Sequence, residues 1–299
     1  MSPKKNERIA PAAPRASSLK ANIPLLSIVF VVVVIVSIIA VSLVTPSQKA
    51  KPTGVASAQL MDQVTNVPSS TLDSVGVAVP LGAGGAVYPQ HILSQPALHL
   101  NGTNPALPSV LYVGAEYCPF CAAERWPLII ALGRFGHFTP LKTVFSAPAP
   151  ESYPNTPTFS FLKAKYVSKY FAFQAVETET VDHKPLEKLS AQHKDIVTKY
   201  DSPNFIAGMP ASSAGAIPFI DMGNQYLVAG SSYSPSALSG LSRDQIASAL
   251  SDASAPTTQF IETAANYLTA SLCQLTKNAP ASVCSSKAVA DARSTMGIK

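Results

Sequence analysis

The sequence predicts an α/β domain that follows one N-terminal transmembrane helix and ends in a helical hairpin linked by a disulfide. Three observations lead to this prediction. Residues 23–44 form an uncharged apolar stretch, short β-branched runs alternate with helical patterns after it, and the four cysteines fall into two close pairs. Alternating strands and helices are typical of α/β folds, and paired cysteines are typical of exported chains.

The apolar stretch at residues 23–44 is long enough to cross the hydrocarbon core of a bilayer as a helix. Five Lys or Arg side chains precede it, and only two follow it closely. The positive-inside rule therefore keeps residues 1–22 in the cytoplasm as a basic tail and places the rest outside the cytoplasm. A tether at residues 45–57 is expected to lead into an exported domain at residues 58–296.

A cleavable signal peptide is the alternative interpretation of residues 23–44. Its apolar region is usually about 7–15 residues long, and the nearest small-residue cleavage site, Ala56-Ser57-Ala58, lies far downstream. We therefore expect an uncleaved single-pass anchor in the lipid bilayer of the cell membrane.

The charge distribution excludes one class of partner. The chain has a net charge of +5, and its first 20 residues contribute +4, from five basic residues and Glu7. No Lys or Arg occurs between residues 52 and 124. A nucleic-acid-binding protein needs a basic surface on its folded part, so nucleic acid is not an expected partner.

The motif Cys118-Pro119-Phe120-Cys121 lies where a predicted strand gives way to a predicted helix. Residues 110–115 are apolar and β-branched, and residues 122–132 are good helix formers with one apolar face. The first sulfur then lies at a helix N-terminus, where free N–H groups and the helix dipole stabilise a thiolate. The second sulfur, one turn along, can attack a mixed disulfide formed by the first. The motif predicts thiol–disulfide exchange, with Cys118 as nucleophile and Cys121 as resolving thiol.

Two other interpretations of this motif stay open. A C-x-x-C is half of many zinc sites, but tetrahedral zinc needs four ligands, and Cys273 and Cys284 are far along the chain. The other interpretation is a purely structural disulfide between Cys118 and Cys121. Such a bridge would close a very small loop, which constrains the unfolded chain little. The five histidines show no metal-ligand spacing and the glycines match no nucleotide motif, so no metal or cofactor is expected.

The second cysteine pair predicts a structural disulfide. Residues 257–275 carry a helical apolar stripe with Cys273 near its end, and residues 282–293 can form a second helix with Cys284 in its first turn. A Cys273–Cys284 bridge would link two antiparallel helices across their turn. Neither cysteine has a fast resolving partner at this spacing, so the predicted role is structural.

The remaining elements are predicted from alternating apolar and polar residues, from helix-capping residues and from turn residues. Strands are expected at 141–146, 158–161 and 171–177, a hairpin at 216–221 and 225–229, and helices at 185–200 and 242–250. The first of these strands follows the CxxC helix, so it is expected to be the second strand of a βαβ unit.

This order of elements resembles the thioredoxin fold: a strand, a C-x-x-C at a helix start, a second strand, and Ile217-Pro218 before a hairpin and a helix. The resemblance implies that Pro218 corresponds to the cis-proline that thioredoxin-like proteins place against their active-site cysteines. The interval between Cys121 and Pro218 is longer than a minimal thioredoxin needs, which implies an insertion at about residues 150–205.

A more specific resemblance covers roughly residues 60–290. The stretches from Gly114 to Trp126 and from Pro157 to Phe161, with the late cysteine pair, are similar to an uncharacterised membrane-anchored group known only as a domain of unknown function, DUF929. This resemblance implies the fold and a redox site, but no substrate.

Three residues near the motif are candidates for tuning the thiols. Tyr117 stands where thioredoxins usually have Trp. Glu116 would disfavour a thiolate if it lay close to Cys118, whereas Arg125 would favour one. The alternative is that Glu116 and Arg125 are solvated surface charges.

Together these features predict a membrane-anchored thiol–disulfide oxidoreductase outside the cytoplasm. Its expected partners are exported proteins with thiols or disulfides and a redox partner in the membrane. The alternative is a non-catalytic thioredoxin-fold module for binding or metal delivery.

Because residues 23–44 are too long for a signal-peptide core, the intact protein should stay in the membrane fraction after alkaline carbonate washing. Protease added outside intact cells should digest the domain that follows. Recovery of a soluble chain beginning near Gln59 would instead show that the segment had been cleaved off.

Overall fold

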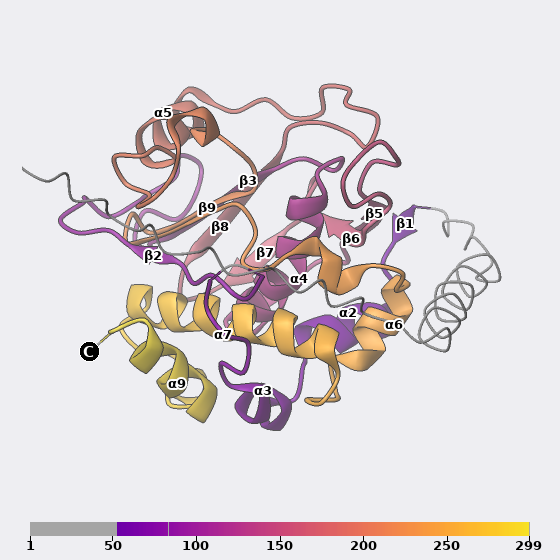
Figure 1. Ribbon diagram of the computed structural model, residues 1–299. Helices are drawn as coiled ribbons and strands as arrows, with labels where there is room; N and C mark the ends of the chain where they lie inside the picture. The colour runs from indigo at the N-terminus through magenta and orange to yellow at the C-terminus, as the bar shows by residue number, and fades with distance from the viewer. Residues whose placement is uncertain (1–52, 83, 299) are drawn as a thin grey trace, which may run out of the picture. The chain divides into compact units, whose positions relative to one another are not determined.

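The computed structural model describes residues 53–82 and 84–298 (Figure 1). Within these residues no helix is long and apolar enough to cross a membrane. The predicted basic tail and anchor, at residues 1–22 and 23–44, lie outside the described residues. The predicted tether extends too far, because β1 (Gly54–Val55) already pairs with a strand of the domain.

A five-stranded mixed sheet forms the centre of the domain, in the order β2-β10-β9-β3-β8. Its strands are β2 (Gln90–His91), β3 (Ser109–Gly114), β8 (Ala172–Glu177), β9 (Phe219–Met222) and β10 (Tyr226–Ala229). β3 pairs parallel with β8 and antiparallel with β9, and β9 forms the predicted hairpin with β10. The predicted α/β class is therefore confirmed, and the sheet is a mixed one.

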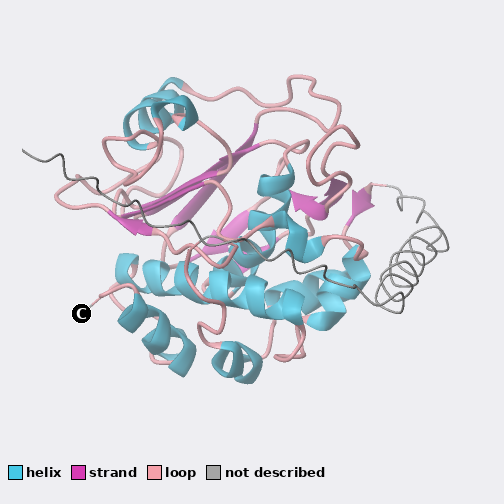
Figure 2. Cartoon of the chain, in the orientation of Figure 1, coloured by secondary structure: helices cyan, strands magenta, loops and turns pink. Residues whose placement is uncertain are grey.

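Helices cover both faces of this sheet (Figure 2). On one face, Tyr112 of β3 belongs to the same apolar cluster as α4 (Pro119–Gly133) and α7 (Pro256–Leu275). On the other face, Leu111 packs with α5 (Ala191–Tyr200). Successive strand residues point to opposite faces, so a strand covered on both sides needs the uninterrupted apolar run that β3 has.

Two smaller antiparallel sheets have the orders β1-β5-β6 and β4-β7. Their further strands are β4 (Gly136–Phe138), β5 (Lys142–Phe145), β6 (Pro157–Ser160) and β7 (Tyr166–Ser168). The shorter helices are α2 (Ala58–Thr65), α3 (Ser69–Val75), α6 (Arg243–Ala249), α8 (Ala281–Cys284) and α9 (Lys287–Thr295), with 3-10 helices η1 (Ala211–Ser213) and η2 (Pro235–Leu238). Of these, α3 and α9 pack against α7.

The predicted βαβ partner of β3 is wrong. β5 follows the CxxC helix, but it pairs antiparallel with β6 in a separate sheet, and β8 is the parallel partner of β3. A period-two pattern identifies a strand without identifying its neighbour, because pairing is set by the whole topology. β8 lies inside the predicted insertion at residues 150–205, so part of that segment belongs to the central sheet.

The helix predicted from Pro185 begins later, at Ala191. Pro185 instead forms an isolated β-bridge with Glu179. Ser190 then caps α5 by accepting the backbone N–H of His193 at 3.1 Å. Ser is preferred as a cap because its side-chain oxygen satisfies an N–H that has no helical partner.

The predicted Cys273–Cys284 disulfide is confirmed. Cys273 lies near the end of α7, as expected. Cys284, however, ends the short α8 and does not lie in the first turn of the following long helix, because α9 begins only at Lys287. The pair Ser285-Ser286 separates the two helices, and serine favours helix ends over helix interiors.

Loss of the disulfide in Cys273→Ala should lower the free energy of unfolding by about 2–3 kcal/mol, because cysteines 11 positions apart close a modest loop in the unfolded chain. Urea denaturation measures this loss. Cys118→Ser, which leaves the bridge intact, is the control, and an equal loss in both variants would contradict a structural role for the bridge.

Candidate active site

Cys118 lies at the N-terminus of α4, as the sequence predicts. It is the N-cap residue with an extended backbone, and Pro119 follows at the start of the helix. The Sγ atom of Cys118 accepts the backbone N–H of Cys121 at 3.1 Å. Proline suits this place because the N–H it lacks would have no helical partner. The sulfur thus takes the place of the side-chain oxygen that usually caps a helix.

The segment before β9 lies against Cys118. The thiol of Cys118 donates to the carbonyl oxygen of Ile217 at 3.8 Å, although the two residues are 99 positions apart. The Ile217–Pro218 peptide bond is cis, and the carbonyl of Pro218 accepts the N–H of Gly230 at 2.8 Å. The structure therefore brings together Cys118, Cys121 and the Ile217–Pro218 peptide.

The two cysteines are free thiols in different surroundings. A hydrogen bond with the Cys121 side chain lowers the pKa of Cys118 and outweighs burial, with smaller contributions from backbone N–H groups and Arg125. Burial raises the pKa of Cys121 well above its ordinary value, and the hydrogen bond with Cys118 adds to this. The thiolate therefore forms at Cys118 while the proton stays on Cys121.

A buried ion pair lies behind the thiols. Arg125 is one helical turn after Cys121, and its guanidinium donates to both carboxylate oxygens of Glu177, at 3.0 and 2.6 Å. The Nη2 group also donates to the carbonyl of Ala115 at 2.7 Å. Both charged side chains are fully buried. Because Ala115 packs with the two cysteines, the guanidinium lies close to them, and its charge lowers the pKa of both thiols.

The loop after β8 is bonded to the same region. Glu187 accepts the backbone N–H of Glu177 through its carboxylate at 2.9 Å, and its own N–H donates to the carbonyl of Glu177 at 3.0 Å. Glu179, at the start of the loop, accepts the backbone N–H of Glu116 at 2.9 Å. Both ends of this loop therefore contact the residues that surround the motif.

Glu116 is also buried, and its Oε1 accepts the hydroxyl of Ser160 at 2.7 Å. The alternative that Glu116 and Arg125 are solvated surface charges is therefore wrong. Each side chain is covered by a strand distant in sequence, Glu116 by β6 and Arg125 by β8. A charged residue beside a motif is recognised as buried only when such a partner strand is known.

Aromatic side chains form a rim around the motif. The ring of Tyr117 lies against that of His183 with centroids 4.0 Å apart, and Phe120 meets Tyr153 edge to face at 5.9 Å. Phe120 is 40% exposed, whereas Cys118 is 4% exposed. Cys118 is thus much less exposed than the aromatic side chain of Phe120 beside it.

Sequence reasoning does not identify Glu177 as a site residue. In the parallel pairing, Gly114 of β3 is opposite Glu177 of β8, which places this carboxylate beside the loop that enters the motif. Ligand and catalytic groups gather at the carboxyl ends of parallel strands. The signal would have been an acid at the end of residues 171–177, had that strand been assigned as the neighbour of β3.

Comparison with protein families finds a match to the family described as Domain of unknown function (DUF929), over residues 97–274. This is more than half of the chain. The chain belongs to the DUF929 family. The region matched to DUF929 contains Cys118, Cys121, Pro218 and Cys273, whereas Cys284 lies beyond it. No curated protein and no solved structure matches the chain.

Arg125→Met should destabilise this DUF929 protein by about 3–5 kcal/mol, because it leaves the Glu177 carboxylate buried without a partner. The double variant Arg125→Met, Glu177→Leu should recover much of this loss, since no unpaired charge remains. Urea denaturation of the single and double variants measures both effects. A double variant that is no more stable than the single one would contradict the assigned pairing.

The rate at which iodoacetamide modifies Cys118 should rise through a midpoint at lower pH than for an unperturbed cysteine in a short peptide, because the pKa of Cys118 is lowered. Cys121→Ala should move this midpoint to higher pH, because the hydrogen bond with the Cys121 thiol makes the largest contribution. Mass spectrometry of the modified Cys118 peptide gives the rates. An unchanged midpoint in Cys121→Ala would show that the thiol of Cys121 does not stabilise the thiolate.

Proposed function

We propose that this DUF929 protein is a membrane-anchored thiol–disulfide oxidoreductase that acts outside the cytoplasm through Cys118 and Cys121. The contrast between the two thiols carries the proposal. Cys118 caps a helix and has a lowered pKa, whereas Cys121 is fully buried behind it with a raised pKa. An attacking sulfur is most effective as a thiolate, and a resolving sulfur must wait until a mixed disulfide has formed.

The proposed fold is thioredoxin-like with a disulfide-linked helical addition at its C-terminal end. The pairing of the strands supports this proposal. β3, α4 and β8 form a parallel βαβ unit, and the β9–β10 hairpin lies antiparallel on the other side of β3. Pro218 directly precedes β9 and lies beside the CxxC motif, as the resemblance to thioredoxins implies.

The proposed reaction consists of two exchanges. The Cys118 thiolate attacks one sulfur of a substrate disulfide, so a mixed disulfide forms and the other substrate sulfur leaves as a thiolate. Cys121 gives its proton to the departing thiolate or to water, and its sulfur then attacks Sγ of Cys118. The Cys118–Cys121 disulfide forms and the second substrate sulfur leaves. The reverse sequence oxidises a substrate dithiol, and a redox partner in the membrane that carries a dithiol or a disulfide resets the pair.

Arg125 assists the second exchange in this proposal. Cys121 must lose a proton inside a fully buried site, and burial disfavours the thiolate. The guanidinium of Arg125 lowers the pKa of Cys121 and is held in place by Glu177 and Ala115. A fixed cation of this kind favours the thiolate at the moment of attack.

The proposed substrates are exported proteins that present a thiol or disulfide on an extended segment. The exposed Phe120 and the half-buried Tyr117 offer apolar contacts beside Cys118. The predicted anchor at residues 23–44 would hold the domain at the membrane, where its redox partner is expected.

A second candidate function is a binding or metal-delivery module that does not catalyse exchange. The low exposure of Cys118, 4%, favours it, because little of this residue is open to a substrate sulfur. Residues 53–82 and 84–298 contain no group of three or more His, Cys, Asp or Glu side chains arranged to hold a metal ion.

Trapping of mixed disulfides tests the proposed exchange. In Cys121→Ser the Cys118 thiolate still attacks but no resolving thiol remains, so covalent complexes with exported proteins should accumulate. They should appear on non-reducing gels as bands that a reductant removes. Cys118→Ser is the matched control and should trap far fewer partners, because Cys121 is fully buried and its raised pKa keeps it protonated.

The wild-type pair should also reduce or oxidise a model peptide with two cysteines. If neither single-cysteine variant traps a partner and the wild-type protein exchanges with no model peptide, the oxidoreductase proposal is lost. The non-catalytic module would then describe the protein better.

A further inference from the structure

Two buried carboxyl groups lie outside the proposed redox site. Asp221 belongs to β9 and Glu262 to α7, and both residues are 0% exposed. The ion pairs found among the described residues include neither of them. Burial of a carboxylate without a paired cation is unfavourable, so each carboxyl needs another source of stabilisation.

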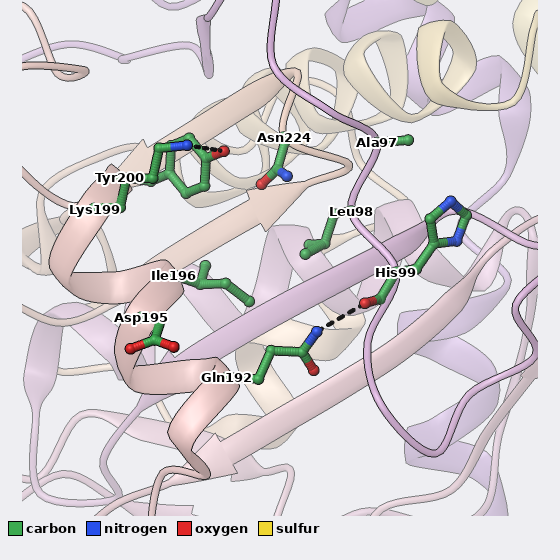
Figure 3. A pocket seen from close by; sticks show the side chains of 9 residues that line it. All are labelled: Ala97, Leu98, His99, Gln192, Asp195, Ile196, Lys199, Tyr200 and Asn224. Atoms are coloured by element: carbon green, nitrogen blue, oxygen red, sulfur yellow. Dashed lines mark hydrogen bonds between the residues drawn. The ribbon is translucent and has the colours of Figure 1, made fainter.

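Asp221 is bonded to the turn of the β9–β10 hairpin. Its Oδ1 accepts the backbone N–H of Asn224 at 2.7 Å, whereas its Oδ2 accepts no hydrogen bond from the described residues. Asn224 lies at this turn opposite α5 (Figure 3), and its Nδ2 donates to the carbonyl of Pro96 at 2.8 Å. This bond fixes the orientation of the amide, because only the nitrogen can donate to a carbonyl. The Oδ1 of Asn224 is then a second buried acceptor without a donor among the described residues.

Glu262 has the same arrangement on α7. Neither of its carboxyl oxygens accepts a hydrogen bond from the described residues. Asn266 follows four positions later, which makes the two side chains neighbours on the helix. The Nδ2 of Asn266 donates to the carbonyls of Leu72 and Gly76 at 3.1 and 2.8 Å, so its Oδ1 is fixed as an acceptor. This oxygen also has no donor within the part of the chain that the structure describes. Each pair of a carboxyl and an amide oxygen thus lacks one hydrogen-bond donor.

The neighbours of Asp221 in the sheet are apolar. The residues opposite it on the two adjacent strands are Leu111 and Leu227. The titratable side chains near the hairpin turn line a surface hollow beside it: His99, Asp195, Lys199 and Tyr200 (Figure 3). Burial raises the pKa of Asp221 to about 7, against the smaller opposing effect of the Asn224 N–H.

One cation, Arg134 at the end of α4, acts on Glu262. Its charge lowers the pKa of Glu262, but burial has the larger effect and raises this pKa to about 8. Asp73 of α3 raises the pKa of Arg134 more than Glu262 does. The charged side chains next to Asp73 are paired with each other on α9: Lys287 and Asp291. The cation nearest to Glu262 is therefore shared with a second carboxylate.

We propose that Asp221 and Glu262 keep their protons in the folded domain and donate them to the amide oxygens of Asn224 and Asn266, so that the domain is most stable in acidic surroundings. A protonated carboxyl carries the O–H donor that each pair lacks, whereas an ionised carboxylate only accepts. Loss of the proton leaves a buried negative charge and two acceptors without a donor, which is unfavourable on both counts. The inference concerns stability and does not depend on the proposed redox reaction.

The stability of the domain should therefore fall as the pH rises. In the unfolded chain both carboxyls ionise at their ordinary pKa values of about 4. In the folded domain they ionise at about 7 and about 8. Between these limits the folded domain holds protons that the unfolded chain has lost, so the equilibrium constant of unfolding should rise about tenfold per pH unit for each carboxyl. The stabilisation is complete below about pH 4 and is lost as the pH rises to about 8.

Asp221→Asn and Glu262→Gln test this, because each supplies an N–H donor of the same shape that needs no proton. Urea denaturation of the full chain in detergent is followed by the fluorescence of Trp126, its single tryptophan. Each variant should match the wild type at about pH 5 and unfold at higher urea than the wild type at about pH 8. Between about pH 5 and 7, each variant should remove about a tenfold rise per pH unit in the unfolding constant. Asp195→Asn, which changes an exposed carboxyl, is the matched control and should keep the pH dependence of the wild type.

Infrared spectroscopy observes the protons directly, because a protonated carboxyl and a carboxylate absorb at different frequencies. At about pH 6 the band of protonated carboxyls should lose intensity in Asp221→Asn and in Glu262→Gln relative to the wild type. Two results would overturn the proposal. One is that both variants keep the wild-type band and the wild-type pH dependence, which would show that the two carboxyls are ionised. The other is a wild-type stability that does not fall between about pH 5 and about pH 8, and this result needs no variant to fold.

Discussion

The parallel pairing of β3 with β8 is the constraint on which the candidate site depends. Its register places Glu177 at the end of the neighbouring strand, beside the loop that enters the CxxC motif. α4 follows that loop, and Arg125 on its second turn donates to the same carboxylate. A buried guanidinium is tolerated only with its partner in place, so this ion pair fixes where α4 begins on the sheet. The position of both thiols follows from it.

The elements that could be predicted from the sequence carry their signals locally. The apolar run of β3, the cysteine at the start of α4 and the capping box of α6 each depend on residues a few positions apart. The β9–β10 hairpin belongs with them, because Gly223 and Asn224 adopt the positive φ that its turn requires. The Cys273–Cys284 pairing was also accessible, since only one connectivity joins cysteines that are close in sequence.

The remainder depends on contacts between distant segments, which no local pattern records. The alternating apolar and polar residues of β5 identify it as a strand. They do not show that its neighbour is β6 rather than β3. Glu116 and Arg125 are charged, and charged residues are mostly exposed. Their burial follows from Ser160 and Glu177, which reach them across 44 and 52 positions of the chain. The two cysteines and Pro218 of the site could therefore be predicted. The buried partners that surround the thiols could not.

The loop between Glu179 and Glu187 has a consequence for how this family can diverge. Its two ends are bonded to Glu116 and Glu177, whereas Asp182, His183 and Lys184 at its tip are exposed. Insertions and deletions at the tip would alter the contact between His183 and Tyr117 but leave the bonds to Glu116 and Glu177 in place, while a change at either end would disturb those bonds. Under the proposed function, the surface next to Cys118 can therefore change in sequence while the groups bonded to Glu116 and Glu177 stay the same, which would separate substrate choice from thiol reactivity.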